Sequence, residues 1–422
     1  MSFRLALATL AVAAVAVAAP ATAGRLDPVI VRGAALAALP DPHTDHLRLY
    51  ARRDGALRPI PYQFDARDAD DTIELAGDAF AVDANDDLVF MAADAGARVS
   101  GAPWPPGATA GLELELSDPR DGGRSWAYLL HFAAPPPRAA TAPYAVLDAD
   151  GLHARSALYE VDYAPGRNIF TALRVTPAAG GNGDSLLRQT RMVGEPTLRI
   201  LLADLRLRFD EQSTIVRVEG VRNGPVRAIR QVHLSVDLGR FFPDLPNGIV
   251  HTYHYAGAFD TPSRIDIPWL VLRTLRAFRF ENVAVFAPAA LPLRYWDGAN
   301  PAGLDIPDGA ATAQAAADHD WWAVSSAAGS ILQVIAIPPA WLDWGIARGT
   351  VTRPDAAGWS LLHMTRLQRH GTYEVRQLMA IVPHGYRPGA EAEALAMVHQ
   401  PLQVQVRRLD LTTLTAADGA PP

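Results

Sequence analysis

The sequence contains neither cysteine nor lysine. Without cysteine the chain has no disulfide, thiol nucleophile, thiolate metal site or lipidated N-terminal cysteine. All 38 basic residues are arginine, which excludes Schiff-base catalysis and the phosphate-binding lysine of a P-loop. The G-x-S-x-G nucleophile elbow and the His-Glu-x-x-His zinc motif are also absent. These absences remove most of the enzyme classes that a short motif can identify.

The overall charge and composition are those of a globular protein. The 422 residues are 49% hydrophobic and carry a net charge of −7. A negative chain is a poor partner for nucleic acid or for an anionic membrane. The 34 prolines and 32 glycines are typical of a loop-rich β protein.

The N-terminus has the pattern of a signal peptide, assigned to residues 1–23. Arg4 precedes a continuous apolar run, Leu5–Ala19, and Ala21-Thr22-Ala23 is a small-x-small cleavage site. We therefore expect a mature chain that begins near Gly24, has no transmembrane span and is periplasmic or extracellular.

Alternation of apolar and polar residues predicts a mainly β fold. The clearest example is the segment 214–239, which predicts two strands joined by a two-residue turn at Asn223-Gly224. The one helical stripe lies in Pro268–Phe280, where an apolar strand pair is the alternative.

The proline-rich linker at Pro135–Pro137 divides the chain. We predict a small N-terminal β domain over residues 24–135, a larger antiparallel β-sandwich domain over residues 144–410, and a disordered tail over residues 411–422. The strand character of Leu402–Leu409 assigns that segment to the large domain.

An acidic turn is the main candidate for a metal site. Asp83, Asn85 and Asp87 alternate as the first three ligands of a calcium loop do, but Leu88 replaces the required glycine and no glutamate closes the loop. The turn is therefore not an EF-hand. It predicts either a single-turn calcium site or an Asx-rich turn that enters a strand, so the cofactor is either none or calcium.

The segment His251–Tyr255 is the main candidate for catalysis. On a strand His251 and Tyr253 share one face and His254 lies on the other. A histidine and a tyrosine on an open sheet face are suited to act as base and acid on a sugar. Arg273 or Arg294 would neutralise a uronate carboxylate. The alternative is an aromatic-lined sheet face with no catalytic role.

Aromatic residues beside polar ones predict a sugar-binding surface. Trp296 and Asp297 form one such pair, and His319 and Trp321 form another. The run Asp318-His319-Asp320 is also a weak metal candidate, which would need a further ligand such as Asp297 or Asp305 because three consecutive side chains of an extended segment do not converge. The alternative is that the tryptophans are anchored in the core.

Two short motifs resemble a known group of proteins. They are Arg58-Pro59-Ile60-Pro61-Tyr62-Gln63-Phe64-Asp65 and Asp86-Asp87-Leu88-Val89-Phe90-Met91. Together they resemble the N-terminal part of uncharacterised secreted bacterial β-sandwich proteins, some of which occur among pectin- and uronate-degrading enzymes. Asp87 stands where that pattern has glutamate. The resemblance covers about 35 residues and includes no catalytic motif, so it assigns no residue a role.

Three functions fit the sequence, the third being a calcium- or other metal-dependent hydrolase that uses the acidic turn or the Asp318-His319-Asp320 run. The first is an exported carbohydrate-binding or carbohydrate-active protein, in its enzymatic form a polysaccharide lyase that acts on acidic glycans. The second is a non-catalytic periplasmic or surface scaffold that binds a protein partner. A deep polar groove would favour the first function and an exposed apolar patch would favour the second.

Overall fold

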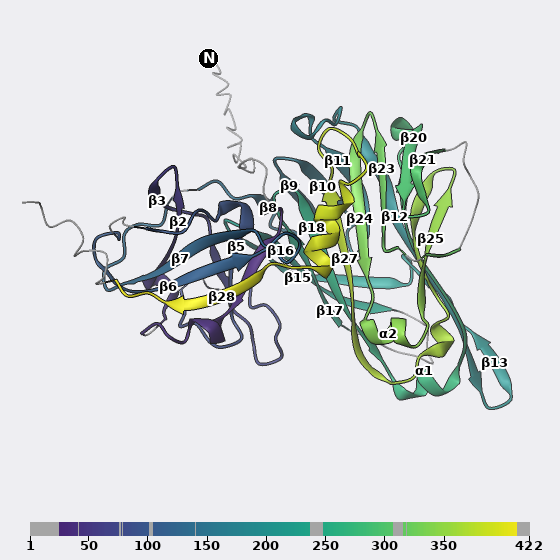
Figure 1. The fold of residues 1–422 in the computed structure, drawn as a ribbon. Helices are drawn as coiled ribbons and strands as arrows, with labels where there is room; N and C mark the ends of the chain where they lie inside the picture. Colours follow the sequence, from purple (N-terminus) through teal and green to yellow (C-terminus); the bar gives the residue numbers. More distant parts are fainter. Residues whose placement is uncertain are drawn as a thin grey trace, which may run out of the picture.

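The computed structural model describes residues 25–411, except 41, 76, 78, 101–103, 140, 237–247, 307–314 and 318. The expected signal peptide, Asp318, and the tail beyond Leu411 lie outside the described residues. The chain is mainly β, as the sequence predicts, and the strands within these described residues form four antiparallel sheets (Figure 1).

The N-terminal unit contains the two smaller sheets. In sheet order the three-stranded sheet is β1 (Pro28–Arg32), β5 (Asp87–Met91) and β4 (Gln63–Asp65). The five-stranded sheet is β28 (Gln403–Arg408), β6 (Ala108–Ser117), β7 (Arg124–Phe132), β2 (Leu47–Arg53) and β3 (Ala56–Pro59). One apolar cluster takes side chains from both sheets, among them Val29, Phe90, Leu49 and Leu114.

The large unit contains the two larger sheets and three α-helices. The 11-stranded sheet is β22 (Ala315–Ala317), β25 (Ala347–Arg353), β26 (Ala356–Leu362), β19 (Leu275–Phe286), β12 (Ser185–Ile200), β11 (Phe170–Val175), β10 (Tyr159–Tyr163), β9 (His153–Ser156) and β8 (Ala145–Leu147), with β13 (Ala203–Arg206) and β14 (Phe209–Asp210) also paired to β12. The nine-stranded sheet is β15 (Thr214–Asn223), β16 (Ala228–Val236), β17 (Gly248–His254), β18 (Ala258–Ile267), β27 (Gly371–Ile381), β24 (Gly329–Ala336), β23 (Trp321–Ser326), β20 (Leu293–Asp297) and β21 (Asn300–Ile306). The α-helices are α1 (Trp269–Thr274), α2 (Pro339–Asp343) and α3 (Glu391–His399).

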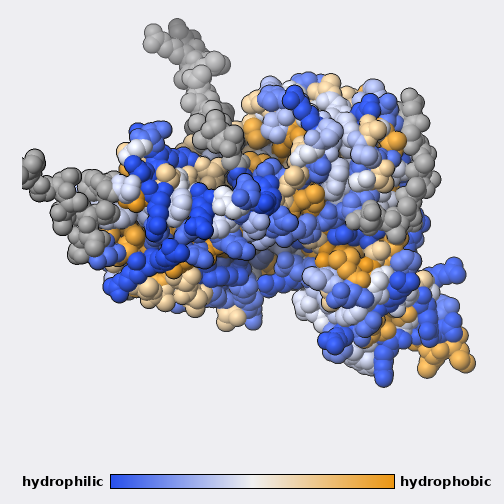
Figure 2. Space-filling model, viewed as in Figure 1, coloured by the Kyte–Doolittle hydropathy of each residue, from blue (hydrophilic) through white to orange (hydrophobic). Residues whose placement is uncertain are grey.

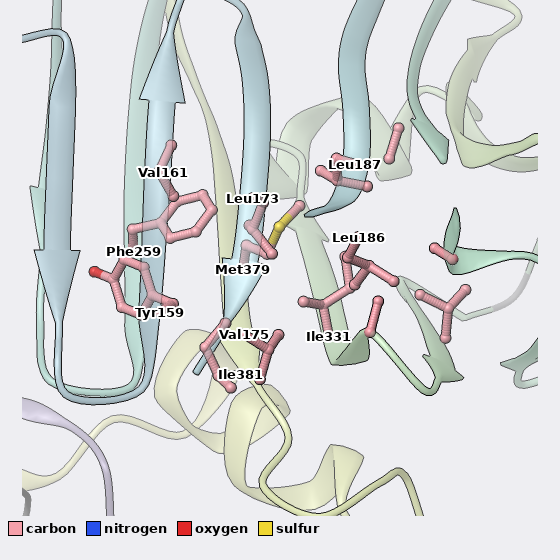
Figure 3. Packing of buried hydrophobic residues seen from close by; sticks show 14 of the residues in the cluster. Tyr159, Val161, Leu173, Val175, Leu186, Leu187, Phe259, Ile331, Met379 and Ile381 are labelled. Atoms are coloured by element: carbon pink, nitrogen blue, oxygen red, sulfur yellow. The ribbon is translucent and has the colours of Figure 1, made fainter. Parts of the chain in front are cut away.

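The main core of the large unit takes side chains from both of its sheets. Tyr159 and Leu173 come from the 11-stranded sheet, and Phe259, Ile331 and Met379 come from the nine-stranded sheet (Figure 3). In β10, buried apolar residues alternate with half-buried polar ones, so this strand turns one face toward the core. In β24 and β27 the residues between the core positions, such as Leu332 and Leu378, are also apolar and buried, and they pack in a second cluster with α3.

The last strand departs from the sequence prediction. The sequence places Leu402–Leu409 in the large domain, but β28 pairs with β6 in the N-terminal unit, with Val404 opposite Leu116 and Val406 opposite Leu114. The chain therefore leaves the large unit after α3 and returns to the first unit (Figure 1). Periodicity predicts a strand but not its pairing partner, which is why the assignment failed.

Two local predictions are also corrected. The helix expected over Pro268–Phe280 ends at Thr274, and Leu275 begins the long strand β19. The hairpin β15–β16 exists, but Asn223 pairs with Ala228, so its loop has four residues instead of two. The Asn223 side chain bonds both backbone groups of Leu147 (2.8 Å each), so the asparagine fixes the loop to its neighbour rather than forming the turn itself. In the described part of the chain, no helix has the length and apolarity that crossing a membrane requires.

Candidate functional site

The predicted acid–base residues lie on β17, but the structure separates them. The side chain of His254 is fully buried and accepts or donates hydrogen bonds with Tyr159 (3.2 Å at Nδ1) and Tyr163 (2.9 Å at Nε2). It is therefore a core histidine that no polymer can reach. His251 and Tyr253 do share one face, and their rings stack with centroids 5.8 Å apart.

The proton affinities of these side chains do not suit catalysis near neutral pH. Burial, helped by Arg67, Arg227 and Arg264, lowers the pKa of His251 to about 4. Burial raises the pKa of Tyr253. General acid–base catalysis is most effective when the pKa lies near the working pH, and these two shifts move away from neutrality in opposite directions.

The predicted uronate-binding arginines are distant from this pair. Tyr253 is opposite Asp260 on β18. From Asp260 the strand continues for seven residues to Ile267, a length of roughly 24 Å at ~3.4 Å per residue. Arg273 lies beyond that end of the strand, on α1. Arg294 lies on β20, five strands away from β17 in the same sheet, again roughly 24 Å at ~4.8 Å per strand. The predicted lyase constellation is therefore not assembled in the structure.

The predicted aromatic surface is half-buried around one tyrosine. The ring centroids of Trp296 and Trp321 lie 4.8 and 5.8 Å from that of Tyr386. Both tryptophans pack against the apolar cluster that includes Ala394 and Met397 of α3. They anchor α3 to the sheet, which corresponds to the core alternative.

Asp297 and His319 do come together, with 3.5 Å between Oδ2 and Nε2. Asp297 is buried and already accepts hydrogen bonds from the hydroxyl of Tyr295 (2.8 Å) and from the backbone and side chain of Asn300 (2.8 Å each). Asp320 turns instead to His399 of α3 and to Arg348. The described members of the Asp318–Asp320 run therefore point to different partners, as expected for an extended segment.

The three residues of the acidic turn make different contacts in the structure. Asp83 is exposed, while the Asn85 amide donates to the carbonyls of Arg67 and Asp68 (3.2 and 2.8 Å). Asp87 is buried against Arg67, with 2.8 Å between Oδ2 and Nη2. Among the described residues no group of three or more acidic or histidine side chains forms a metal-binding cluster.

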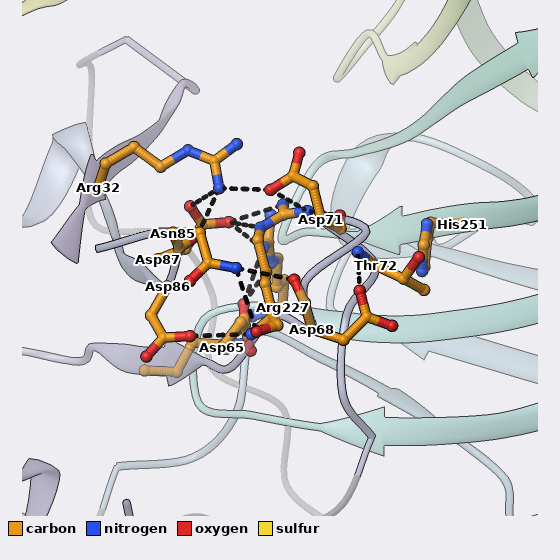
Figure 4. Close-up of polar contacts among 12 residues, drawn as sticks. Arg32, Asp65, Asp68, Asp71, Thr72, Asn85, Asp86, Asp87, Arg227 and His251 are labelled. Atoms are coloured by element: carbon orange, nitrogen blue, oxygen red, sulfur yellow. Dashed lines mark hydrogen bonds and ion pairs between the residues drawn. The ribbon is translucent and has the colours of Figure 1, made fainter. Parts of the chain in front are cut away.

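Asp87 belongs instead to a buried charge network at the junction of the two units (Figure 4). At its centre Arg227, from the β15–β16 loop, pairs with Asp65 of β4 (2.7 Å) and lies 3.7 Å from Asp87. Its guanidinium also lies over the Tyr253 ring, 4.2 Å from the centroid. Gln63 accepts hydrogen bonds from the backbone N–H groups of Val226 and Arg227 (3.1 and 2.8 Å).

This network accounts for two sequence features. A Cβ on Gly224 would lie 2.2 Å from the Gln63 side chain. Glycine at this position therefore allows the β15–β16 loop to pack against Gln63. The resemblance motif that contains Gln63 and Asp65 supplies the other half of the contact. Both features therefore serve the contact between the two units, and the side chains of the network pack against one another.

A second arginine cluster lies on the outer face of the 11-stranded sheet and lines a hollow of about 310 Å³. Its volume is at the lower end of the range of small-ligand sites. Its lining side chains come from β12, β19, β25 and the segment before β14, and they are Arg191, Val193, Glu195, Arg208, Arg279, Glu281, Val283 and Arg353. None of these described lining residues is a histidine or a tyrosine.

The lining of this arginine hollow has four arginines and two glutamates. Glu281 is held by Arg279 and Arg353 (2.6 and 2.5 Å). Burial would raise the pKa of Glu281, but the hydrogen bonds from these two arginines outweigh it and the pKa is lowered. The side chains of Arg208 and Arg279 remain 60% and 55% exposed. The hollow therefore offers accessible guanidinium N–H groups and carboxylate oxygens in one place.

Sequence reasoning missed this hollow. Its signal is alternation of charged and apolar residues on two neighbouring strands, Arg191-x-Val193-x-Glu195 and Arg279-x-Glu281-x-Val283. The charged residues lie four apart in the first strand and two apart in the second, and in both strands they share one face. The second pattern begins within Pro268–Phe280, where the sequence leaves a helix and a strand pair as alternatives.

A further pocket lies between α3 and the nine-stranded sheet and is lined mainly by apolar residues such as Leu332, Val382 and Met397. Its lining also includes three polar side chains, those of His384, Arg387 and Glu393. No protein-family model and no curated protein matches this sequence.

Proposed function

We propose that this chain is an exported carbohydrate-binding protein and that its glycan lies in the arginine hollow across β12 and β19. The observation that carries the proposal is the combination of half-exposed guanidinium groups with carboxylates in one hollow. We also infer that the two large sheets pack face to face as a sandwich, which leaves this face of the 11-stranded sheet open to a polymer.

The chemistry of the lining fits an acidic sugar. A guanidinium binds a carboxylate through two parallel hydrogen bonds, and carboxylate oxygens such as those of Glu195 accept from sugar hydroxyls. Glu211 and Asp210, at 3.7 Å from Arg191 and 3.9 Å from Arg208, bring the local charge close to zero. Binding by such a site relies on directional hydrogen bonds, so we expect it to weaken only moderately as salt is added.

A binding role fits better than a lyase role. His254 is buried and Tyr253 is nearly so. The arginines that the sequence predicts for a lyase, Arg273 and Arg294, lie far from both. The arginine hollow has hydrogen-bonding groups, but its described lining lacks a side chain that titrates near neutral pH. The polymer should therefore be bound and released unchanged.

The test is calorimetric titration of the chain from Gly24 onward with polygalacturonate and with a neutral galactan. We expect binding to the acidic polymer, and at least tenfold weaker binding by the double variant Arg208→Gln/Arg279→Gln. The matched control is Arg217→Gln, an exposed arginine of β15 that pairs with Glu219 at 2.7 Å, which should bind as the unmodified protein does.

Three results would contradict the proposal. They are no heat with either polymer, an equal loss of affinity in the Arg217→Gln control, or an affinity that the double variant retains. Formation of unsaturated uronate products during incubation would contradict the non-catalytic part of the proposal alone.

A further inference from the structure

The hairpin that joins β12 to β13 ends in two exposed leucines. Ile200 pairs with Ala203, so Leu201 and Leu202 form a two-residue turn. Their side chains are 93% and 97% exposed. The hairpin projects beyond the sheets at one end of the large unit, and its tip forms an apolar patch between polar flanks (Figures 1 and 2).

The turn is built from residues that its geometry does not favour. Leu201 has a φ of +54°, a conformation that two-residue hairpin turns normally give to glycine or asparagine. Leucine here strains the backbone and also exposes an apolar side chain to water. Neither folding nor solubility explains the choice, which indicates that the leucines contact something outside the chain.

More exposed apolar residues lie next to the tip. Helix α1 contacts β12, and Leu275, which follows α1, pairs with Leu198 near the end of β12. Trp269 and Leu270 of α1 are 57% and 46% exposed. Of the nine large apolar side chains that are exposed in the described part of the chain, five lie in this region, named here the apolar end: Ile200, Leu201, Leu202, Trp269 and Leu270.

Positive charge surrounds the apolar end. Exposed arginines flank the tip and α1, and two exposed aspartates lie among them: the arginines are Arg199, Arg206, Arg273 and Arg276, and the aspartates are Asp204 and Asp266. Four positive and two negative charges give an excess of two, in a chain whose net charge is −7. The global charge therefore hides a local surface of the opposite sign.

We propose that the apolar end binds the surface of a phospholipid bilayer that contains anionic lipids, with Leu201 and Leu202 inserted among the acyl chains. A projecting tip with two almost fully exposed side chains needs a medium that closes around it, which a bilayer does and a flat protein surface does not. Apolar side chains rimmed by arginine are suited to this interface, because the guanidiniums remain at the level of the headgroups. Anionic headgroups complement the local charge.

Vesicle sedimentation tests the proposal with the chain from Gly24 onward, which keeps every described residue. The probes are vesicles of phosphatidylcholine alone and vesicles with added phosphatidylglycerol. We expect sedimentation mainly with the anionic vesicles. The variant Leu201→Gly/Leu202→Asn should lower the partition coefficient at least tenfold, while its turn residues suit the hairpin better than the native pair. The matched control is Ile215→Asn, which removes an exposed apolar side chain (55%) from β15.

A fluorescent label tests insertion directly. Because the chain has no cysteine, Leu202→Cys gives a single site for an environment-sensitive dye, and Ile215→Cys gives the control site. We expect a blue shift and protection from iodide only at position 202 and only with anionic vesicles.

The proposal is overturned if the unmodified protein sediments with neither vesicle, or if the tip variant sediments equally well. It is also overturned if the protein binds no vesicle and instead forms a dimer that the tip variant dissociates, since a second copy of the chain would then cover the tip. Loss of glycan binding in the arginine variants has no bearing on these outcomes, because the two sites use different residues.

Discussion

The junction of the two units and the arginine hollow both combine arginine with carboxylate, but they differ in burial. At the junction of the two units Arg227 and Asp65 are almost completely buried and pair at 2.7 Å. In the arginine hollow Arg279 pairs with Glu281 at 2.6 Å but remains more than half exposed. Similar distances therefore accompany different roles: the first cluster is enclosed and joins parts of the chain, whereas the second is open to a ligand.

The largest expected effect is at the junction. Replacing Arg227 by methionine leaves the buried carboxylates of Asp65 and Asp87 with fewer partners, and removal of one member of a buried ion pair costs about 3–5 kcal/mol. We expect a loss of that size in the free energy of unfolding, measured by urea denaturation followed by circular dichroism.

The matched control for the junction is Arg217→Met, on the same hairpin. Its side chain is 74% exposed, and an exposed ion pair contributes about 0–1 kcal/mol. Equal losses in the two variants would show that burial does not distinguish the two kinds of cluster.

The next effect is a dependence of stability on pH that comes from the buried histidine of β17. Burial, with Arg230 nearby, lowers the pKa of His254 from 6.5 to about 3. Between these two pH values His254 is protonated in the unfolded chain but not in the folded protein. Its contribution to the free energy of unfolding is therefore fully present above pH 6.5 and is lost as the pH falls below that value. From pH 7 to pH 5 this residue should cost about 2 kcal/mol, at 1.36 kcal/mol per pKa unit.

The variant His254→Gln should reduce that pH-dependent loss by about 2 kcal/mol, whatever its effect at pH 7. Urea denaturation at pH 7 and at pH 5 measures the difference. The control is His370→Gln, at an exposed position, which should leave the loss at the unmodified size. An unchanged loss in His254→Gln would mean that His254 is protonated in the folded protein.

The fold was more predictable than the site. Period-2 alternation identified the hairpin strands β15 and β16, because alternation is a property of adjacent residues. It did not predict that β28 pairs with β6, because partner choice depends on the whole chain. His251 and His254 were candidates because of their residue type, but burial decides whether either side chain can react. The alternation of charged residues that lines the hollow can be seen in the sequence only when β19 is recognised as a strand throughout.

The smallest expected effect on stability is at the arginine hollow. Arg279→Gln removes an ion pair whose arginine side chain is 55% exposed, so the free energy of unfolding should fall by less than about 1 kcal/mol. The same substitution should weaken polygalacturonate binding much more than it weakens the fold. The Arg279 guanidinium uses some of its N–H groups to bind Glu281 and presents the others to the ligand. Denaturation and calorimetry on the same preparation measure both quantities. A loss of stability as large as that of Arg227→Met would show that the hollow, like the junction, mainly holds the fold together.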